Sequence, residues 1–284
     1  MDVNNQKYVK KLDKYIKYLR EEEKCENTIV KYERDIKVFL EFSKSKTLNK
    51  TAVIEFKDYL KTKYVPASSN SMLAAVNSFL QWLGKGDLKV KPLKIQRNAF
   101  LDSKKELSIY EYERLVMTAK NQNNEKLALI IQTICCTGIR VSELKFIDVE
   151  STITGEAKVS CKGKNRTVFL PKKLRVALKR FCSKNSITIG SVFVTKNSNP
   201  LDRTNIWKMM KRLCKAAKVD PQKVFPHNLR HLFARTYYKI EKDISSLADV
   251  LGHSNINTTR IYTAQSSCYH AKRIEKMKLA VFLA

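Results

Sequence analysis

The chain has 284 residues, 43% of them hydrophobic, so it is long enough for two domains with apolar cores and is not a disordered basic tail. Lysine and arginine number 55 against 27 acidic residues, and the formal net charge of +28 favours a polyanionic partner, nucleic acid first. An anionic membrane is less favoured, since no long apolar run, lipidation motif or N-terminal signal core is present, and we expect a cytoplasmic protein.

Residues 5–87 show the apolar periodicity of four helices that pack as a small bundle. Asn49 is expected to cap the third helix, Ser68 to Ser71 to open the fourth, and Gly84 to end it. The outer faces of the first two helices carry basic residues: Lys10, Lys11, Lys14, Lys17, Lys31, Arg34 and Lys37. In a chain of this charge we expect that surface to face DNA, and an ordinary solvated face is the alternative.

Residues 88–103 lack a helical pattern. Pro92 and several basic residues predict an extended linker here, which would follow the DNA backbone between two domains or would simply be solvated.

The second domain is expected to begin near residue 104. Ser108 and Glu111 form a capping-box pattern, and the apolar run 127–136 predicts a buried core helix. Thr-Gly then breaks that helix and presents Arg140. Glu143, three residues on, is expected to hold the Arg140 guanidinium from behind, and an ordinary local ion pair is the alternative.

Alternating residues predict a β-hairpin over 158–171, with Lys162, Gly163, Lys164 and Asn165 in the turn. Helices are expected over 172–184 and 202–218. The second has basic residues on its outer face, which would lie on a duplex.

Three of the 4 histidines fall in residues 225–263. A helix starting near Pro226 would place His227 and Arg230 on one side, with His231 turned about 100° away. A second helix ends at Gly252, just before His253, and Asn257 to Thr259 are expected to cap a short helix that carries Tyr262.

These residue types suit phosphoryl transfer to a tyrosine. Arginine presents a fork of donors to phosphate oxygens, histidine moves protons near neutral pH, and tyrosine can act as a covalent nucleophile. The alternative is structural: His227 as a helix cap, Arg230 in an ion pair and Tyr262 as a core aromatic.

The spaced motifs resemble the conserved boxes of the tyrosine recombinase (phage integrase) family. The family's first box is matched by TGIRVSEL, and its second box by HNLRH followed by LGH and TRIY. Its β-hairpin lysine is matched by the lysine of SCKGK. The resemblance covers Lys105 to the C-terminus well and the earlier part by general character. It implies six active-site residues: Arg140, Lys162, His227, Arg230, His253 and Tyr262, with Tyr262 as nucleophile.

The resemblance also implies the fold. We expect a mainly α protein with a small β-sheet, in which residues 1–87 form a helical core-binding (SAM-like) domain and residues 104–284 an α+β catalytic domain. The chain leaves no room for an extra arm-binding domain, so it resembles the two-domain Xer-like members. The hairpin turn is a residue shorter than the usual G-K-G-x-x-K-x-R. Lys162 is favoured as the catalytic lysine because it precedes the glycine, and Lys164 is the alternative.

The implied activity is site-specific DNA cleavage and rejoining through a 3′-phosphotyrosyl intermediate. Neither a metal nor another cofactor is expected, and the 7 scattered cysteines suggest neither a zinc site nor a disulfide framework. The expected assembly is a homotetramer on two DNA duplexes in a bacterial or phage-host cytosol, with a C-terminal helix over 268–282 packing on a neighbour. Type IB topoisomerase-like cleavage without exchange, and a catalytically silent DNA-binding protein, are the alternatives.

Overall fold

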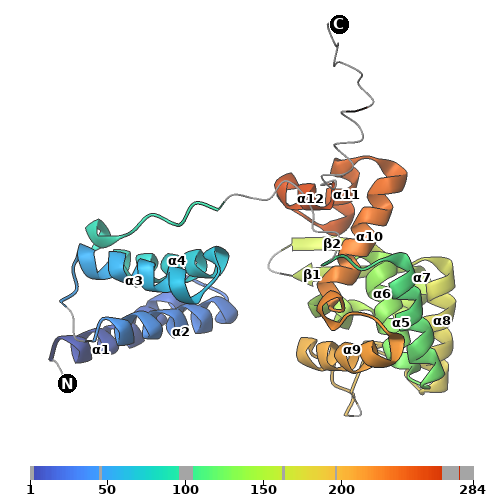
Figure 1. Ribbon diagram of the computed structural model, residues 1–284. Helices are drawn as coiled ribbons and strands as arrows, with labels where there is room; N and C mark the ends of the chain where they lie inside the picture. Colours follow the sequence, from blue (N-terminus) through green and yellow to red (C-terminus); the bar gives the residue numbers. More distant parts are fainter. Residues whose placement is uncertain are drawn as a thin grey trace, which may run out of the picture. The chain divides into compact units, whose positions relative to one another are not determined.

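The computed structural model describes residues 3–44, 47–95, 105–161, 164–195 and 197–263, together with residue 275. The chain divides into two compact units, residues 1–97 and 98–284, and each has its own hydrophobic core (Figure 1). The elements within the described ranges are helices, apart from one two-stranded sheet and two isolated bridges, which confirms the expected fold class. Among those helices, none has both the length and the apolar character needed to cross a bilayer.

The first unit is the expected bundle of four helices. They are α1 (Val3–Glu21), α2 (Glu26–Phe42), α3 (Lys50–Lys63) and α4 (Pro66–Trp82), and a 3₁₀ turn, η1 (Gly86–Leu88), follows. The Asn49 side chain accepts a hydrogen bond from the Ala52 amide, as its capping role predicts. Helix α4 begins before the expected serines because Pro66, whose fixed φ suits a first turn, starts it.

Part of the predicted DNA-facing surface of this unit is neutralised locally. The Asp35 side chain is buried at 1% exposure and accepts hydrogen bonds from both Lys31 and Arg34. A buried carboxylate needs such partners, because desolvating an unpaired charge is costly. Lys37 is paired with Glu33 in the same helix. The charge available to a polyanion on α2 is therefore smaller than the count of basic residues suggests.

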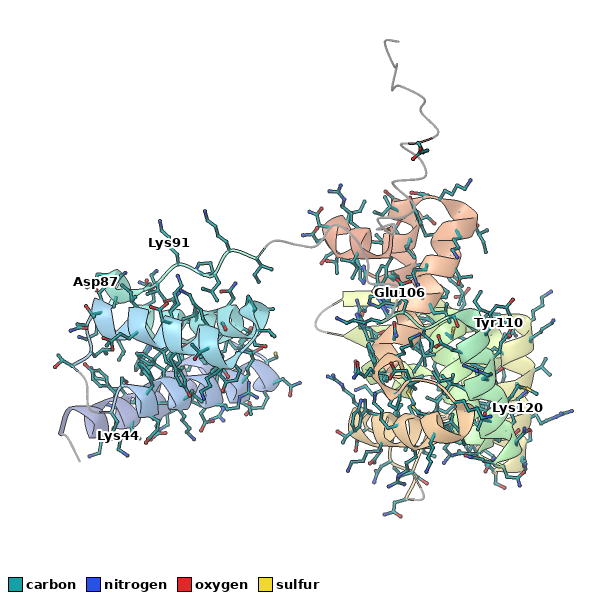
Figure 2. All side chains as sticks on the ribbon, viewed as in Figure 1. Lys44, Asp87, Lys91, Glu106, Tyr110 and Lys120 are labelled. Carbon is teal, nitrogen blue, oxygen red and sulfur yellow. The ribbon has the colours of Figure 1, made fainter. Side chains whose placement is uncertain are left out.

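The described part of the predicted linker, residues 88–95, is fastened to α4. Asn77 exchanges two hydrogen bonds with the backbone of Val90, at 2.8 and 3.0 Å, and Asn70 exchanges two with Leu93, at 2.9 and 2.7 Å. Leu88 and Val90 bury their side chains in the bundle core, whereas Lys91, which follows Val90, is exposed (Figure 2). This stretch is extended, as expected, but it belongs to the first unit rather than to a free linker.

The second unit is built around one buried helix. Its elements are α5 (Ile109–Asn121), α6 (Glu125–Thr137), η3 (Val141–Phe146), α7 (Val149–Thr154), β1 (Glu156–Cys161), β2 (Lys164–Phe169), α8 (Lys172–Lys184), α9 (Arg203–Ala217), η4 (Pro221–Lys223), α10 (Pro226–Glu241), α11 (Ile244–Leu251) and α12 (Ile256–Thr263). Helix α6 packs against α5, α8, α9 and α10, and its apolar run from Leu127 to Ile131 is buried on every side. The C-terminal end of this central helix therefore lies inside the unit, where it introduces Arg140.

The hairpin differs from its predicted form. Strands β1 and β2 pair antiparallel, with Cys161 opposite Lys164 and Ser160 opposite Asn165. Lys164 and Asn165 thus lie in β2, and their predicted place in the turn is wrong. The pairing continues to the end of each strand, which leaves two residues between them, the length typical of tight hairpins. Those two residues, Lys162 and Gly163, lie outside the described residues, so Lys162 has no assigned position.

Candidate active site

The site begins where α6 ends. Gly138 adopts a left-handed conformation, with φ of +63°, and a Cβ there would lie 2.4 Å from the Phe233 ring of α10. Both the conformation and the close approach favour glycine. The turn at Gly138 stops the helix and leads to η3, and Arg140, the N-cap residue just before η3, is half-exposed.

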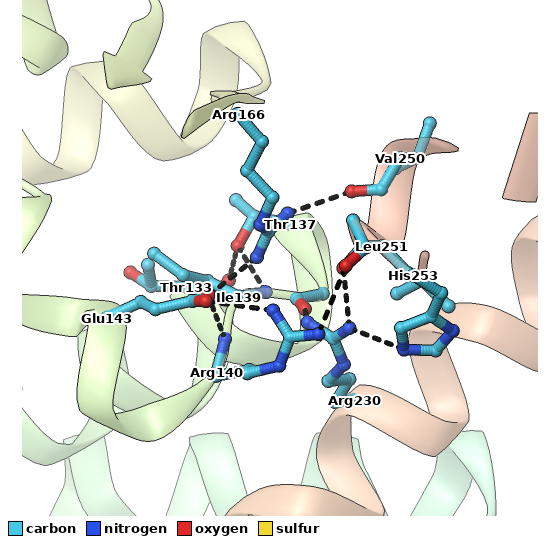
Figure 3. A network of polar contacts seen from close by, with 12 residues as sticks. Thr133, Thr137, Ile139, Arg140, Glu143, Arg166, Arg230, Val250, Leu251 and His253 are labelled. Carbon is cyan, nitrogen blue, oxygen red and sulfur yellow. Dashed lines mark hydrogen bonds and ion pairs between the residues drawn. The ribbon is translucent and has the colours of Figure 1, made fainter. Parts of the chain in front are cut away.

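Arg140 is held by Glu143. The Glu143 carboxylate accepts from the Arg140 guanidinium at 2.8 Å and from the Arg140 backbone amide at 2.9 Å. A third donor, the Arg166 Nη2 of strand β2, lies 2.6 Å from the same carboxylate (Figure 3). Burial raises the pKa of Glu143, but these donors outweigh it and hold the pKa below its ordinary value. The carboxylate is therefore ionised and fixes one face of Arg140.

Arg230 is almost fully buried, at 1% exposure, and reaches across the unit from α10. Its Nη1 donates to the Gly138 carbonyl, and its Nη2 donates to the Leu251 carbonyl at 2.7 Å. Burial, and then the charge of Arg140, lower the pKa of Arg230 to about 10, so it remains cationic at neutral pH. One guanidinium thus joins the ends of α6 and α11.

The same Nη2 also contacts His253, whose Nε2 lies 3.0 Å away. A guanidinium can only donate, so the Nε2 of His253 is the acceptor and the ring proton sits on Nδ1. That Nδ1 lies 2.9 Å from the hydroxyl of Thr259, which is fully buried. These two contacts fix the tautomer and the orientation of His253.

Tyr262 lies against two of the histidines. Its ring stacks on His253, with centroids 6.0 Å apart, and meets His231 edge-on at 4.7 Å. His231 also meets His227 edge-on at 4.6 Å, because residues four apart share one face of α10. His231 therefore joins the cluster, and the expectation that it points elsewhere is wrong. The Tyr262 side chain is buried, at 3% exposure, whereas His227 is exposed.

All three histidines are kept neutral. Burial, followed by the charge of Arg230 and Arg140, lowers the pKa of His253 to about 4. Burial, followed by His227, lowers the pKa of His231 to about 4. Partial desolvation and the same arginines also lower the pKa of His227. Neutral imidazoles at physiological pH can accept a proton, which a charged imidazolium cannot.

The shifted histidines predict a pH-dependent stability. Between the folded pKa of about 4 and the ordinary value of about 6.5, the unfolded chain binds more protons. Stability is therefore fully present above pH 6.5 and falls as the pH drops towards 4, by roughly 1–2 kcal/mol per histidine at pH 5. Urea unfolding of a Trp82→Phe variant, followed through Trp207 of the second unit, should show this loss between pH 7.5 and 5. His231→Phe should flatten the slope, and an unchanged slope would contradict the assignment.

Five of the six expected active-site residues lie together: Arg140, His227, Arg230, His253 and Tyr262. They come from η3, α10, α12 and the loop after α11. Beside them lies a cleft of about 680 Å³, bordered by Arg140, Asn165, Arg166 and His253. Within the described parts of the chain, no group of three or more His, Cys, Asp or Glu side chains is arranged to hold a metal ion. Arg166 was missed as a site residue, although Lys164, Asn165 and Arg166 match the K-x-R end of the usual hairpin pattern.

Comparison with known proteins finds two matching family models and similar recombinases. The "Phage integrase family" model matches residues 105–267, and the "Phage integrase, N-terminal SAM-like domain" model matches residues 12–85. The tyrosine recombinase XerA of Pyrococcus horikoshii is 28% identical over 277 residues, covering 94% of this chain and 93% of that protein.

Solved structures share the fold. The XerH site-specific recombinase bound to its difH substrate, in a pre-cleavage complex, aligns with a TM-score of 0.70 at 21% identity, covering 93% of this chain and 83% of that one. A lambda integrase tetramer bound to a Holliday junction aligns with a TM-score of 0.71 at 18% identity, covering 88% and 75%. With two domain models matched in order, and the catalytic one spanning more than half of the sequence, the chain belongs to the phage integrase family.

Proposed function

We propose that the protein is a site-specific DNA recombinase that cleaves and rejoins strands through a 3′-phosphotyrosyl intermediate. The observation that carries this proposal is the convergence of Tyr262 with two guanidiniums and two neutral histidines in one site. Such a set holds a phosphate, supplies a nucleophile and moves protons.

The charge balance of the site favours an anionic ligand. In the described part of the site, three guanidiniums lie with two carboxylates: Glu143 contacts Arg140 and Arg166, and Asp249 borders the cleft. Arg230 donates to backbone carbonyls, which carry only partial charges. A scissile phosphate would complete the balance, and donors already held in place would stabilise the extra charge of its pentavalent transition state without reorganising.

In the proposed reaction the Tyr262 oxygen attacks the phosphorus and the bond to the 5′-oxygen breaks. The proton of the Tyr262 hydroxyl passes to His231, the neutral ring beside it, and His227 on the far side of His231 assists this proton transfer. Lys162 donates a proton to the leaving 5′-oxygen, giving a 5′-hydroxyl. Arg140, whose side chain is 39% exposed, contacts a non-bridging oxygen, and the charge of Arg230 and the fixed ring of His253 stabilise the phosphate from behind. Because the phosphotyrosyl bond replaces the phosphodiester bond, the reverse steps rejoin a strand without ATP.

The proposal extends to the whole chain. Residues 1–87, with residues 88–95 fastened to them, would form the core-binding domain, the rest of 88–103 the connection and 104–284 the catalytic domain, which together would hold a duplex. By analogy with the tetrameric relative, four copies would assemble on two duplexes in the cytosol of a bacterial or phage host. The expected contact of the C-terminal helix with a neighbour falls on residues 264–274 and 276–284, outside the described residues, and stays a prediction.

The test begins with a duplex selected by the protein from a random pool. A nicked form of this duplex should trap a covalent protein–DNA adduct, visible as a shifted band on a denaturing gel. Two intact duplexes of different length, each carrying the site, should yield exchanged products. Relaxation of supercoiled DNA without exchange would favour the topoisomerase-like alternative. Binding with neither adduct nor exchange would favour a catalytically silent DNA-binding protein.

A further inference from the structure

The C-terminal end of α11 is surrounded by arginines. The last carbonyls of a helix have no partner within the helix and carry partial negative charge. Here the carbonyls of Val250, Leu251 and Gly252 each accept from a guanidinium (Figure 3). Arg166 donates to the first at 2.8 Å, Arg230 to the second at 2.7 Å and Arg140 to the third at 3.4 Å. One helix end thus fixes three arginines that come from three different elements.

Arg166 differs from Arg140 in what its donors do. Its Nη1 is used by the Val250 carbonyl and its Nη2 by Glu143, and its side chain is only 12% exposed. Its Nε is buried and finds no hydrogen-bond partner in the described structure. Arg140, by contrast, keeps a side chain that is 39% exposed. Arg166 is therefore placed to hold other groups rather than to contact a phosphate.

The backbone beside Arg166 is shaped to admit it. Gly252 has a φ of +65°, and a Cβ at this position would lie 2.3 Å from the Cδ of Arg166. The glycine between α11 and His253 thus gives the Arg166 side chain room to pass towards Glu143 and Val250. Without Arg166, the buried Glu143 would lose its shortest contact from a guanidinium and α11 one of its carbonyl partners.

We propose that Arg166 is a positioning residue of this active site: it ties strand β2 to Glu143 and to the end of α11, and thereby sets Arg140 and His253 in the geometry that binds the scissile phosphate. This inference rests on the proposed function. Arg140 is held through their shared partner Glu143, and His253 through the α11 terminus that directly precedes it. Small displacements of such groups reduce rates strongly, by about 10²-fold for roughly 1 Å.

The test compares two substrates that differ in the charge of the scissile phosphate. Arg166→Met, which keeps the length and apolar stem of the side chain, should slow single-turnover cleavage of the nicked duplex by roughly 10²-fold. DNA binding should change by less than about threefold, because the residue is buried. On a duplex with a neutral methylphosphonate at the scissile position, the ratio of wild-type to variant rate should fall below about tenfold, because less charge needs to be stabilised.

Arg175→Met is the matched control. Arg175 also donates to carbonyls at a helix end, those of Thr152 and Ile153 in the last turn of α7, and also lies against a glycine with positive φ, Gly155. None of its contacts in the described structure reaches the active-site network, so its removal should leave both cleavage rates within about threefold of wild type, the spread expected for a remote site.

Two results would overturn the inference. In one, Arg166→Met cleaves both substrates like wild type. In the other, the variant is equally slow on both, which would mean that Arg166 merely supports the fold. If Arg166→Met does not fold, Arg166→Lys carries the test, since it keeps the charge but lacks the fork that bridges two acceptors. Wild-type protein that forms no adduct on the ordinary duplex would instead overturn the proposed function.

Discussion

Replacing Tyr262 with phenylalanine is expected to abolish the covalent protein–DNA adduct while leaving DNA binding intact. The ring lies between His231 and His253 at 3% exposure, so phenylalanine fills the same space and only the hydroxyl is lost. Arg230 keeps its contacts with Leu251, Gly138 and His253, and the phosphate-binding groups stay in place. Loss of an attacking group typically lowers a rate by 10⁴-fold or more, about the detection limit of an adduct assay.

The measurement is adduct formation on the nicked duplex, alongside a gel-shift titration of the same variant. Tyr237→Phe is the matched control, because Tyr237 packs beside the same small cluster and its hydroxyl bonds only to Ser246 among the described contacts. It should form adducts at the wild-type rate. Adducts that persist in Tyr262→Phe would show that a different residue, such as Tyr269 or a cysteine, attacks the phosphate.

The sequence predicted those parts of the site that depend on local rules. Gly138 follows an apolar helical run, and Gly252 follows another, and both end their helices in the left-handed conformation. His227 and Arg230 share a face of α10 because they are three residues apart. Five of the six residues that the resemblance implies therefore lie together, since each of them sits at or next to a helix end whose position the pattern sets.

The remaining parts depend on contacts between distant segments. Arg166 is separated from Glu143 by 23 residues and from Val250 by 84, and no periodicity links these positions. Likewise, the side chains of Asn70 and Asn77 hydrogen-bond to the backbone of the segment after η1. Part of the predicted linker is therefore packed against α4. Arginine and asparagine side chains are usually solvated, so the hydrophobic pattern of the sequence does not predict that these ones contact other segments.

His231 shows a different reason for a failed prediction. The expected turn of about 100° holds relative to Arg230, but His231 is four residues from His227 and therefore shares its face of α10. The partner that covers that face was not evident from the sequence. Helix α12 brings Tyr262 against it, and the packing of α12 on α10 is tertiary. His231, which was expected to point away, therefore lies between His227 and Tyr262.

Either of two hairpin lysines, Lys162 or Lys164, could be the proton donor to the leaving 5′-oxygen, and we expect it to be Lys162. Lys162→Ala should slow cleavage by roughly 10²–10⁴-fold, the usual contribution of a general acid, while Lys164→Ala should mainly weaken binding. Lys164 opens strand β2, paired with Cys161, so its backbone is held by the sheet. Lys162 precedes it in the two-residue connection, the position that matches the family lysine.

A 5′-bridging phosphorothiolate separates the two roles. Its sulfur leaves as a thiolate and needs no proton, so the loss of a general acid should not slow it. Lys162→Ala should therefore cleave this substrate at close to the wild-type rate, and Lys164→Ala should show the same modest defect on both substrates. Arg166→Met serves as the contrast: if it places phosphate-binding groups and not the proton donor, sulfur substitution should leave its defect in place. Rescue of Lys164→Ala alone would reverse the choice and make Lys164 the proton donor.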